Sequence, residues 1–214
     1  MEVLTAEELR VLGALIEKEA TTPDQYPLTM NGLLSATNQT SNRNPVVTYG
    51  AATVAGVITH LRELGLARVV HSPSNRAEKY RHVVHEAWAL SADELAVLAV
   101  LVLRGPQTAT ELRSRTERYG DLEDMGGVEG VLHRLKNRYD EPYVVRLERQ
   151  PAHRDERWAH LLAGEILDVP AVAPTPRSAG NAERVAALEA QVAQLTDELT
   201  TVRTDLDRLL ALLD

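Results

Sequence analysis

Few side chains in this sequence of 214 residues have the spacing that catalysis or metal binding requires. His82 and His85 are three residues apart, and on the strand expected there they would point to opposite faces. Glu17 and Glu19 are interpreted as solvated helix surface rather than as an acid and base pair. The sequence contains no serine-hydrolase, phosphate-loop or zinc-protease motif. We therefore expect a non-enzymatic protein without a cofactor or a metal site.

Polar and cationic side chains near two predicted loops are better suited to binding. The candidate contacts to DNA or to a partner protein are Arg43, Asn42, Gln39, Tyr49, Arg76, Lys79 and Arg81. Arg43 is the only charged residue between Asn38 and Val47, and a guanidinium can fork onto a phosphate or a carboxylate. We expect Arg43 to lie beside the start of the third helix, where the helix dipole also favours an anion.

The segment around Arg43 also has a structural interpretation. It carries four side-chain amides, at Asn38, Gln39, Asn42 and Asn44. These amides can satisfy nearby backbone groups, and Pro45 can set the entry to the next helix. We accordingly expect Asn38→Ala to lower stability, and Arg43→Ala to weaken binding at a nearly unchanged melting temperature.

The elements that position these residues arise from an internal duplication. Residues 4–18 align without gaps with residues 90–104, at an offset of 86. Both copies open with a capping box, formed by Thr5 with Glu8 and by Ser91 with Glu94. Because a capping box satisfies backbone N–H groups at a helix start, a helix is expected to begin at the same place in each copy.

Each copy continues as further helices followed by two short strands rich in β-branched residues. The expected strands are Ala67 to His71, Lys79 to Val84, Tyr143 to Glu148 and Arg157 to Leu162. A Pro-containing turn typical of a wing joins the strands of each pair. This order predicts a mainly α chain with small β wings and two tandem winged-helix domains, residues 1–88 and 89–168. A helical bundle is the alternative, but it leaves the repeated strand pairs unexplained.

The third helix of a winged-helix domain usually enters the DNA major groove. In the first domain, apolar residues from Val54 to Leu64 form the expected buried stripe, so Ala52, Gly56 and Thr59 face outward without a basic neighbour. In the second domain, acidic residues surround the start of the corresponding helix. This pattern argues against phosphate contacts by either helix.

Residues 169–182 contain three prolines and are interpreted as a linker. Residues 183–214 carry an unbroken heptad pattern, which predicts a coiled-coil helix. The predicted dimerisation seam is Val185, Leu188, Val192, Leu195, Leu199, Val202, Leu206, Leu209 and Leu213. Opposite charges beside the seam favour a parallel homodimer, and docking of this helix onto its own domains is the alternative.

Two stretches, Glu17 to Val47 and Leu103 to Gly164, resemble the YceH-like family of uncharacterised bacterial proteins. The second stretch contains LRGPQTATELRSRTERYGDLEDM and ends in RDERWAHLLAG. The resemblance covers essentially the whole chain and implies a tandem winged-helix fold without an established activity or catalytic residues. Where family members commonly have ACNQKSNR, residues 36–43 of this chain are ATNQTSNR, with one positive charge fewer.

The formal net charge is -8, and no part of the chain is strongly basic, so DNA binding would depend on local patches. The lack of cysteine and of a long apolar run, with a charged N-terminus, predicts a cytoplasmic protein without a membrane partner. Two functions stay open. One is a dimeric, DNA-associated transcriptional regulator that uses the loop and wing of the first domain. The other is a protein–protein interaction module.

Overall fold

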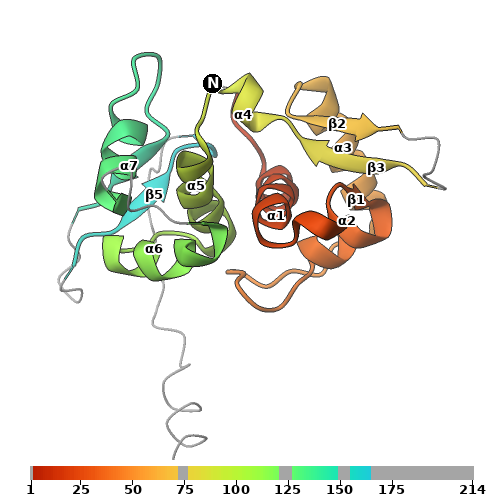
Figure 1. Cartoon of the computed structure of the whole chain (residues 1–214), viewed down its shortest axis with the longest axis horizontal. Helices are drawn as coiled ribbons and strands as arrows, with labels where there is room; N and C mark the ends of the chain where they lie inside the picture. Colours follow the sequence, from red (N-terminus) through yellow and green to blue (C-terminus); the bar gives the residue numbers. More distant parts are fainter. Residues whose placement is uncertain (1, 72–76, 121–126, 149–154, 165–214) are drawn as a thin grey trace, which may run out of the picture. The chain divides into compact units, whose positions relative to one another are not determined.

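A computed structural model shows a mainly helical chain with two small antiparallel sheets, consistent with a winged-helix-like fold (Figure 1). The structure describes residues 2–71, 77–120, 127–148 and 155–164. The predicted linker and coiled-coil seam, residues 169–214, lie outside the described residues.

The described helices and strands follow one another in two similar sets. The first set is α1 (Ala6–Thr21), η1 (Pro23–Gln25), β1 (Leu28–Thr29), α2 (Met30–Thr37), α3 (Ala51–Glu63), β2 (Ala67–Val70) and β3 (Lys79–His82). After the short α4 (Val84–Ala87), the second set is α5 (Ala92–Arg104), α6 (Ala109–Thr116), η2 (Glu117–Tyr119), α7 (Gly127–Lys136), β4 (Val144–Arg146) and β5 (Trp158–His160). We call residues 2–83 the first half and residues 90–164 the second half.

The two aligned helices, α1 and α5, begin at their predicted capping boxes. The Thr5 hydroxyl accepts a hydrogen bond from the Glu8 N–H at 3.2 Å, and the Glu8 carboxylate accepts one from the Thr5 N–H at 2.8 Å. The two helices pack against each other, as Figure 1 shows. Gly13 permits this approach, because a Cβ at its position would lie 3.0 Å from the Leu103 side chain.

The strands confirm the predicted pairs, although each is shorter than expected. In the first half the sheet order is β1-β3-β2, with Leu28 opposite Tyr80 and Val69 on the other side of Tyr80. In the second half β4 pairs with β5, and Gln107 bridges to Trp158 of β5 in the position that β1 occupies in the first half. Strand β1 and its counterpart at Gln107 are too short to give an alternating pattern, so the sequence did not indicate them.

The third helix of each half buries the expected stripe. On α3, Val54, Ile58 and Leu61 are buried, while Ala52, Gly56 and Thr59 are exposed. On α7, the four buried residues are Val128, Val131, Leu132 and Leu135. The apolar periodicity of these helices therefore identified their inner faces correctly.

Backbone hydrogen bonds join the two halves at two places besides the α1–α5 contact. The Leu4 N–H donates to the Leu162 carbonyl at 2.9 Å, and the Asn44 N–H donates to the Leu103 carbonyl at 2.8 Å. The second of these bonds comes from the segment that holds Arg43, so the candidate site lies where the two halves meet.

Candidate functional site

Arg43 is buried, contrary to the prediction that it contacts a ligand. Its side chain is 0% exposed, and its guanidinium forms a two-point ion pair with Glu17, at 3.0 Å for Nη1 to Oε1 and 2.5 Å for Nη2 to Oε2. It also donates to the Ala36 carbonyl at 2.9 Å. Burial lowers the pKa of Arg43 to about 10. In this structure Arg43 is a structural brace, and its burial keeps the guanidinium away from DNA or a partner.

The prediction for Arg43 is wrong because Glu17 was predicted to be solvated. Glu17 is only 1% exposed and does not lie on a solvated surface. A buried carboxylate is costly without a cation, and Arg43 supplies one from 26 residues away. Glu17 also accepts a hydrogen bond from Arg118 of η2, whose side chain is 39% exposed. One carboxylate thus holds two arginines, one from each half.

The side-chain amides of the segment after α2 confirm their predicted structural role. The Asn38 side chain accepts from the Tyr49 N–H at 2.8 Å and donates to the Tyr49 carbonyl at 2.9 Å. Tyr49, a predicted contact to DNA or a partner, is half-buried and packs against the core. The two bonds hold the residue before the N-cap of α3 in place.

Gln39 and Asn42 are also engaged within the protein. Gln39 accepts from Lys18 Nζ at 3.1 Å and donates to the Ser41 carbonyl at 2.9 Å. The Asn42 side chain accepts from Arg104 Nη1 at 2.9 Å, which ties this segment to the end of α5. Because of these contacts, the segment that was predicted to contact DNA or a partner instead connects the two halves.

The predicted wing residues keep more exposure. Lys79 is half-buried, and Arg81, with 36% side-chain exposure, lies 3.2 Å from Glu86. Arg68 stands directly opposite Arg81 in the sheet and contacts the same carboxylate at 3.2 Å. Arg76 lies outside the described residues. Glu86 therefore offsets part of the positive charge of this wing.

The outward face of α3 carries small uncharged side chains over its first two turns. Ala51, Ala52, Thr53 and Gly56 are all exposed there. Ionisable side chains follow in the later turns of the helix, at His60, which pairs with Glu8, and then at Arg62 and Glu63. The predicted absence of basic side chains therefore holds over the first two turns of α3, but not at Arg62 near its end.

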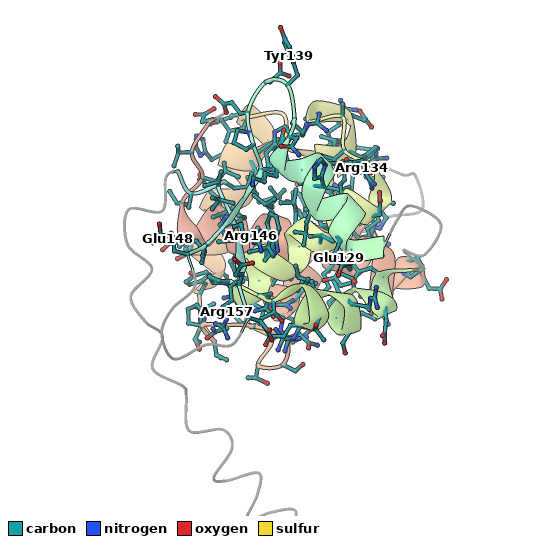
Figure 2. The ribbon with its side chains drawn as sticks, turned by 90° about the vertical axis from the view of Figure 1, so that its left-hand side faces the viewer. Glu129, Arg134, Tyr139, Arg146, Glu148 and Arg157 are labelled. Atoms are coloured by element: carbon teal, nitrogen blue, oxygen red, sulfur yellow. The ribbon has the colours of Figure 1, made fainter. Side chains whose placement is uncertain are left out.

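The second half presents a different surface. Figure 2 shows Glu129 and Arg134 on α7 and Tyr139 at the tip of the loop that follows it. Arg134 pairs with Asp93 at the start of α5, and Arg146 of β4 pairs with Glu156. Tyr139 is fully exposed. These carboxylates therefore neutralise part of the positive charge of Arg134 and Arg146.

The histidine pair differs from its predicted geometry. His85 lies in the short helix α4 and not on a strand, and its ring meets the His82 ring edge to face at 5.8 Å. His82 is fully buried, and its Nε2 lies 2.6 Å from Glu19. Burial opposes ionisation of Glu19, but the hydrogen bond with His82 and nearby cationic groups hold the pKa of Glu19 below its usual value. Within the described parts of the chain, no group of three or more His, Asp or Glu side chains is placed to bind a metal ion.

A further sequence match relates a half-buried histidine of the second half to His82. RAEKYRHVV, residues 76–84, aligns with RDERWAHLL, residues 154–162, and sets His160 of β5 in register with His82 of β3. Burial lowers the pKa of His160 to about 4. This match has an offset of 78, whereas the helices align at 86, so a search at one fixed offset does not detect it.

Taken together, the fold and site describe a mainly helical protein with winged-helix-like elements and a charged connector between its halves. The family model described as a protein of unknown function, DUF480, matches residues 4–153. The chain is 47% identical over 194 residues to a UPF0502 protein of Solibacter usitatus, covering 90% of this chain and 92% of the relative.

Two further relatives have similar coverage. A UPF0502 protein of Pelobacter propionicus is 44% identical over 211 residues, which is 96% of this chain and 95% of the relative. A UPF0502 protein of Serratia proteamaculans is 43% identical over 200 residues, which is 92% of this chain and 94% of the relative. The chain belongs to this uncharacterised bacterial family, as its resemblance indicated. No helix in the described ranges is long and apolar enough to cross a membrane.

Proposed function

We propose that the chain is a non-enzymatic interaction protein of two winged-helix domains, residues 1–88 and 89–168, which binds a partner protein through the outward face of α3. The observation that carries the proposal is the uncharged, small-residue surface over the first two turns of α3. A surface without cations does not attract phosphates, and small side chains let a partner approach the helix backbone closely.

Gly56 supports this interpretation. A glycine inside a helix costs about 0.5–1 kcal/mol relative to alanine. An added Cβ at Gly56 would meet nothing within 4 Å, and the residue has no left-handed φ. The described fold therefore gives no reason for a glycine here, whereas close packing of a partner onto α3 would give one.

The test places a photo-crosslinking amino acid at Thr59 of the full chain in living cells. Thr59 is exposed on α3, and the matched control position is Ser114, which is exposed on α6. We expect one discrete protein adduct from Thr59, reduced by the added substitution Gly56→Leu, and no such adduct from Ser114. Equal adduct patterns at both positions would contradict the proposal.

A second candidate function is DNA association, which the wing cations Lys79 and Arg81 favour. Binding to a random-sequence duplex at two salt concentrations tests it, because phosphate-driven binding falls steeply with salt. We expect weak binding by the parent. Steeply salt-dependent binding that the triple change Arg76→Ala, Lys79→Ala and Arg81→Ala makes less salt-dependent would favour DNA instead.

The oligomeric state forms a separate part of the proposal, in which residues 183–214 pair in parallel with a second copy in the cytoplasm. Light scattering on the full chain and on a version ending at Pro176 tests the pairing. We expect a dimer for the first and a monomer for the second at tens of micromolar, where a coil of about four heptads should pair. Monomers in both cases would favour docking of the helix onto its own chain.

A further inference from the structure

The connector between the halves collects more positive than negative charge. We define the connector cluster as Arg10, Lys18, Arg43, Arg118 and Glu17. Arg10 Nη2 donates to the Pro45 carbonyl at 2.6 Å, and Lys18 Nζ donates to Gln39 at 3.1 Å. Arg43 and Arg118 both bind Glu17. Of the four cationic side chains, two thus bind the carboxylate of Glu17 and two donate to neutral groups, in a protein whose net charge is -8.

Two donors of this cluster are buried without a hydrogen-bond partner in the described structure. They are Nη1 of Arg10, a residue only 4% exposed, and Nε of Arg43. Burial lowers the pKa of Arg10, and the charge of Arg43 lowers it further. The same two causes lower the pKa of Lys18. The cations therefore repel one another, and an additional anion would relieve that repulsion.

The reachable edge of the cluster is formed by Lys18 and Arg118. Lys18 is half-buried and follows Glu17 in α1, while Arg118 is 39% exposed and contacts Glu17 directly. Ser41 is exposed beside Gln39, which holds Lys18. An ammonium, a guanidinium fork and a hydroxyl make up the donor set that suits the several oxygens of a phosphate.

We propose that the connector cluster binds a small phosphate-bearing ligand at the edge formed by Lys18 and Arg118. The size follows from charge, because the acidic protein repels a long polyanion while one phosphate feels mainly the nearby cations. A phosphate on Arg118 competes with Glu17 for that guanidinium. Binding therefore loosens a contact between the halves while Arg43 continues to hold Glu17. The site is separate from the α3 face and does not depend on the proposed function.

Inorganic phosphate is the probe, added to the full chain with chloride at equal ionic strength as the reference. We expect phosphate to raise the melting temperature and to give a saturable calorimetric binding curve, because a ligand that binds only the folded state stabilises it. Lys18→Gln and Arg118→Gln should each weaken binding about tenfold, and Lys18→Arg should retain most of it. Far-UV circular dichroism and urea unfolding verify that each variant is folded.

The matched control is Arg113→Gln on α6, where the side chain is 68% exposed and lies 3.8 Å from Glu129. This variant should change phosphate affinity less than twofold, and so should Gly56→Leu. Equal stabilisation by phosphate and chloride would overturn the proposal, as would unchanged affinity in the double variant Lys18→Gln and Arg118→Gln.

Two further experiments identify other occupants. If phosphate binds only after Asp121→Asn, Glu123→Gln and Asp124→Asn are introduced together, the anion of this site is the chain's own acidic segment. If duplex DNA binds through Lys18 and Arg118 while inorganic phosphate and a nucleotide do not, the site is a nucleic-acid contact. Either result overturns the small-ligand proposal.

Discussion

The two halves of the chain place different chemistry at equivalent positions. Glu17 of α1 corresponds to Leu103 of α5 at the offset of 86, and both residues are 1% exposed. The first half therefore buries an ion pair where the second half buries a leucine. The comparison indicates that the scaffold itself does not require the charge, since α5 is formed without it. Glu17 and Arg43 instead connect the first half to Arg118 of the second.

The equivalent histidines His82 and His160 extend this comparison. His82 of the first half lies 2.6 Å from Glu19, whereas the position equivalent to Glu19 in the second half is Gly105. His160 accordingly lacks this carboxylate, and burial alone lowers its pKa to about 4.

The largest effect is expected from breaking the ion pair of the first half. Arg43→Ala should lower the free energy of unfolding by about 3 kcal/mol, because it leaves the buried Glu17 with Arg118 alone. Urea unfolding measures this. The double change Glu17→Leu and Arg43→Met imitates the second half and should recover much of the loss. A loss below about 1 kcal/mol for Arg43→Ala would contradict the role of Arg43 as a brace.

A smaller effect is expected at Asn38, which has both hydrogen bonds to Tyr49. Asn38→Ala should lower the free energy of unfolding by about 2 kcal/mol, because two half-buried backbone groups lose their partner. Thermal unfolding measures the change, with Ser41→Ala, at an exposed position in the same segment, as the control. Similar losses in both variants would show that the segment is sensitive to any substitution.

His160 should make stability depend on pH. Its folded pKa, about 4, lies below the ordinary value of 6.5, so the unfolded chain binds the proton more readily. The contribution is fully present above pH 6.5 and is lost as pH falls towards 4. We expect a loss of about 1–2 kcal/mol at pH 5, allowing for partial exposure. Urea unfolding from pH 7 to 4.5 should show a flatter profile for His160→Leu than for the parent, and parallel profiles would refute this role.

The smallest effect is expected from the contact between α1 and α5. Gly13→Ala gains helix propensity but forces its Cβ to 3.0 Å from Leu103 and Val102, so we expect a net loss of about 1 kcal/mol. Gly56→Ala meets no atoms and should instead raise stability by about 0.5–1 kcal/mol. Urea unfolding of both variants tests the contrast, which fails if the two changes have the same sign.

Local signals in the sequence were sufficient for much of the fold. The capping boxes at Thr5 and Ser91 placed two helix starts, and β-branched runs placed β2 to β5 within a few residues. The apolar spacing on α3 and α7 identified their buried faces. These features depend on residues only a few positions apart, and for that reason a single sequence contains them.

The role of the candidate site depended on contacts that no local pattern contains. Whether Glu17 is solvated or buried is decided by Arg43 and Arg118, which lie 26 and 101 residues away in the chain. Until the chain folds back, Arg43 has the same chemistry as an exposed ligand-binding arginine. In the folded protein Arg43 is removed from water. Because an unpaired buried charge is costly, Arg43 pairs with Glu17 and acts as a brace. Lys18 and Arg118 remain at the reachable edge of the cluster.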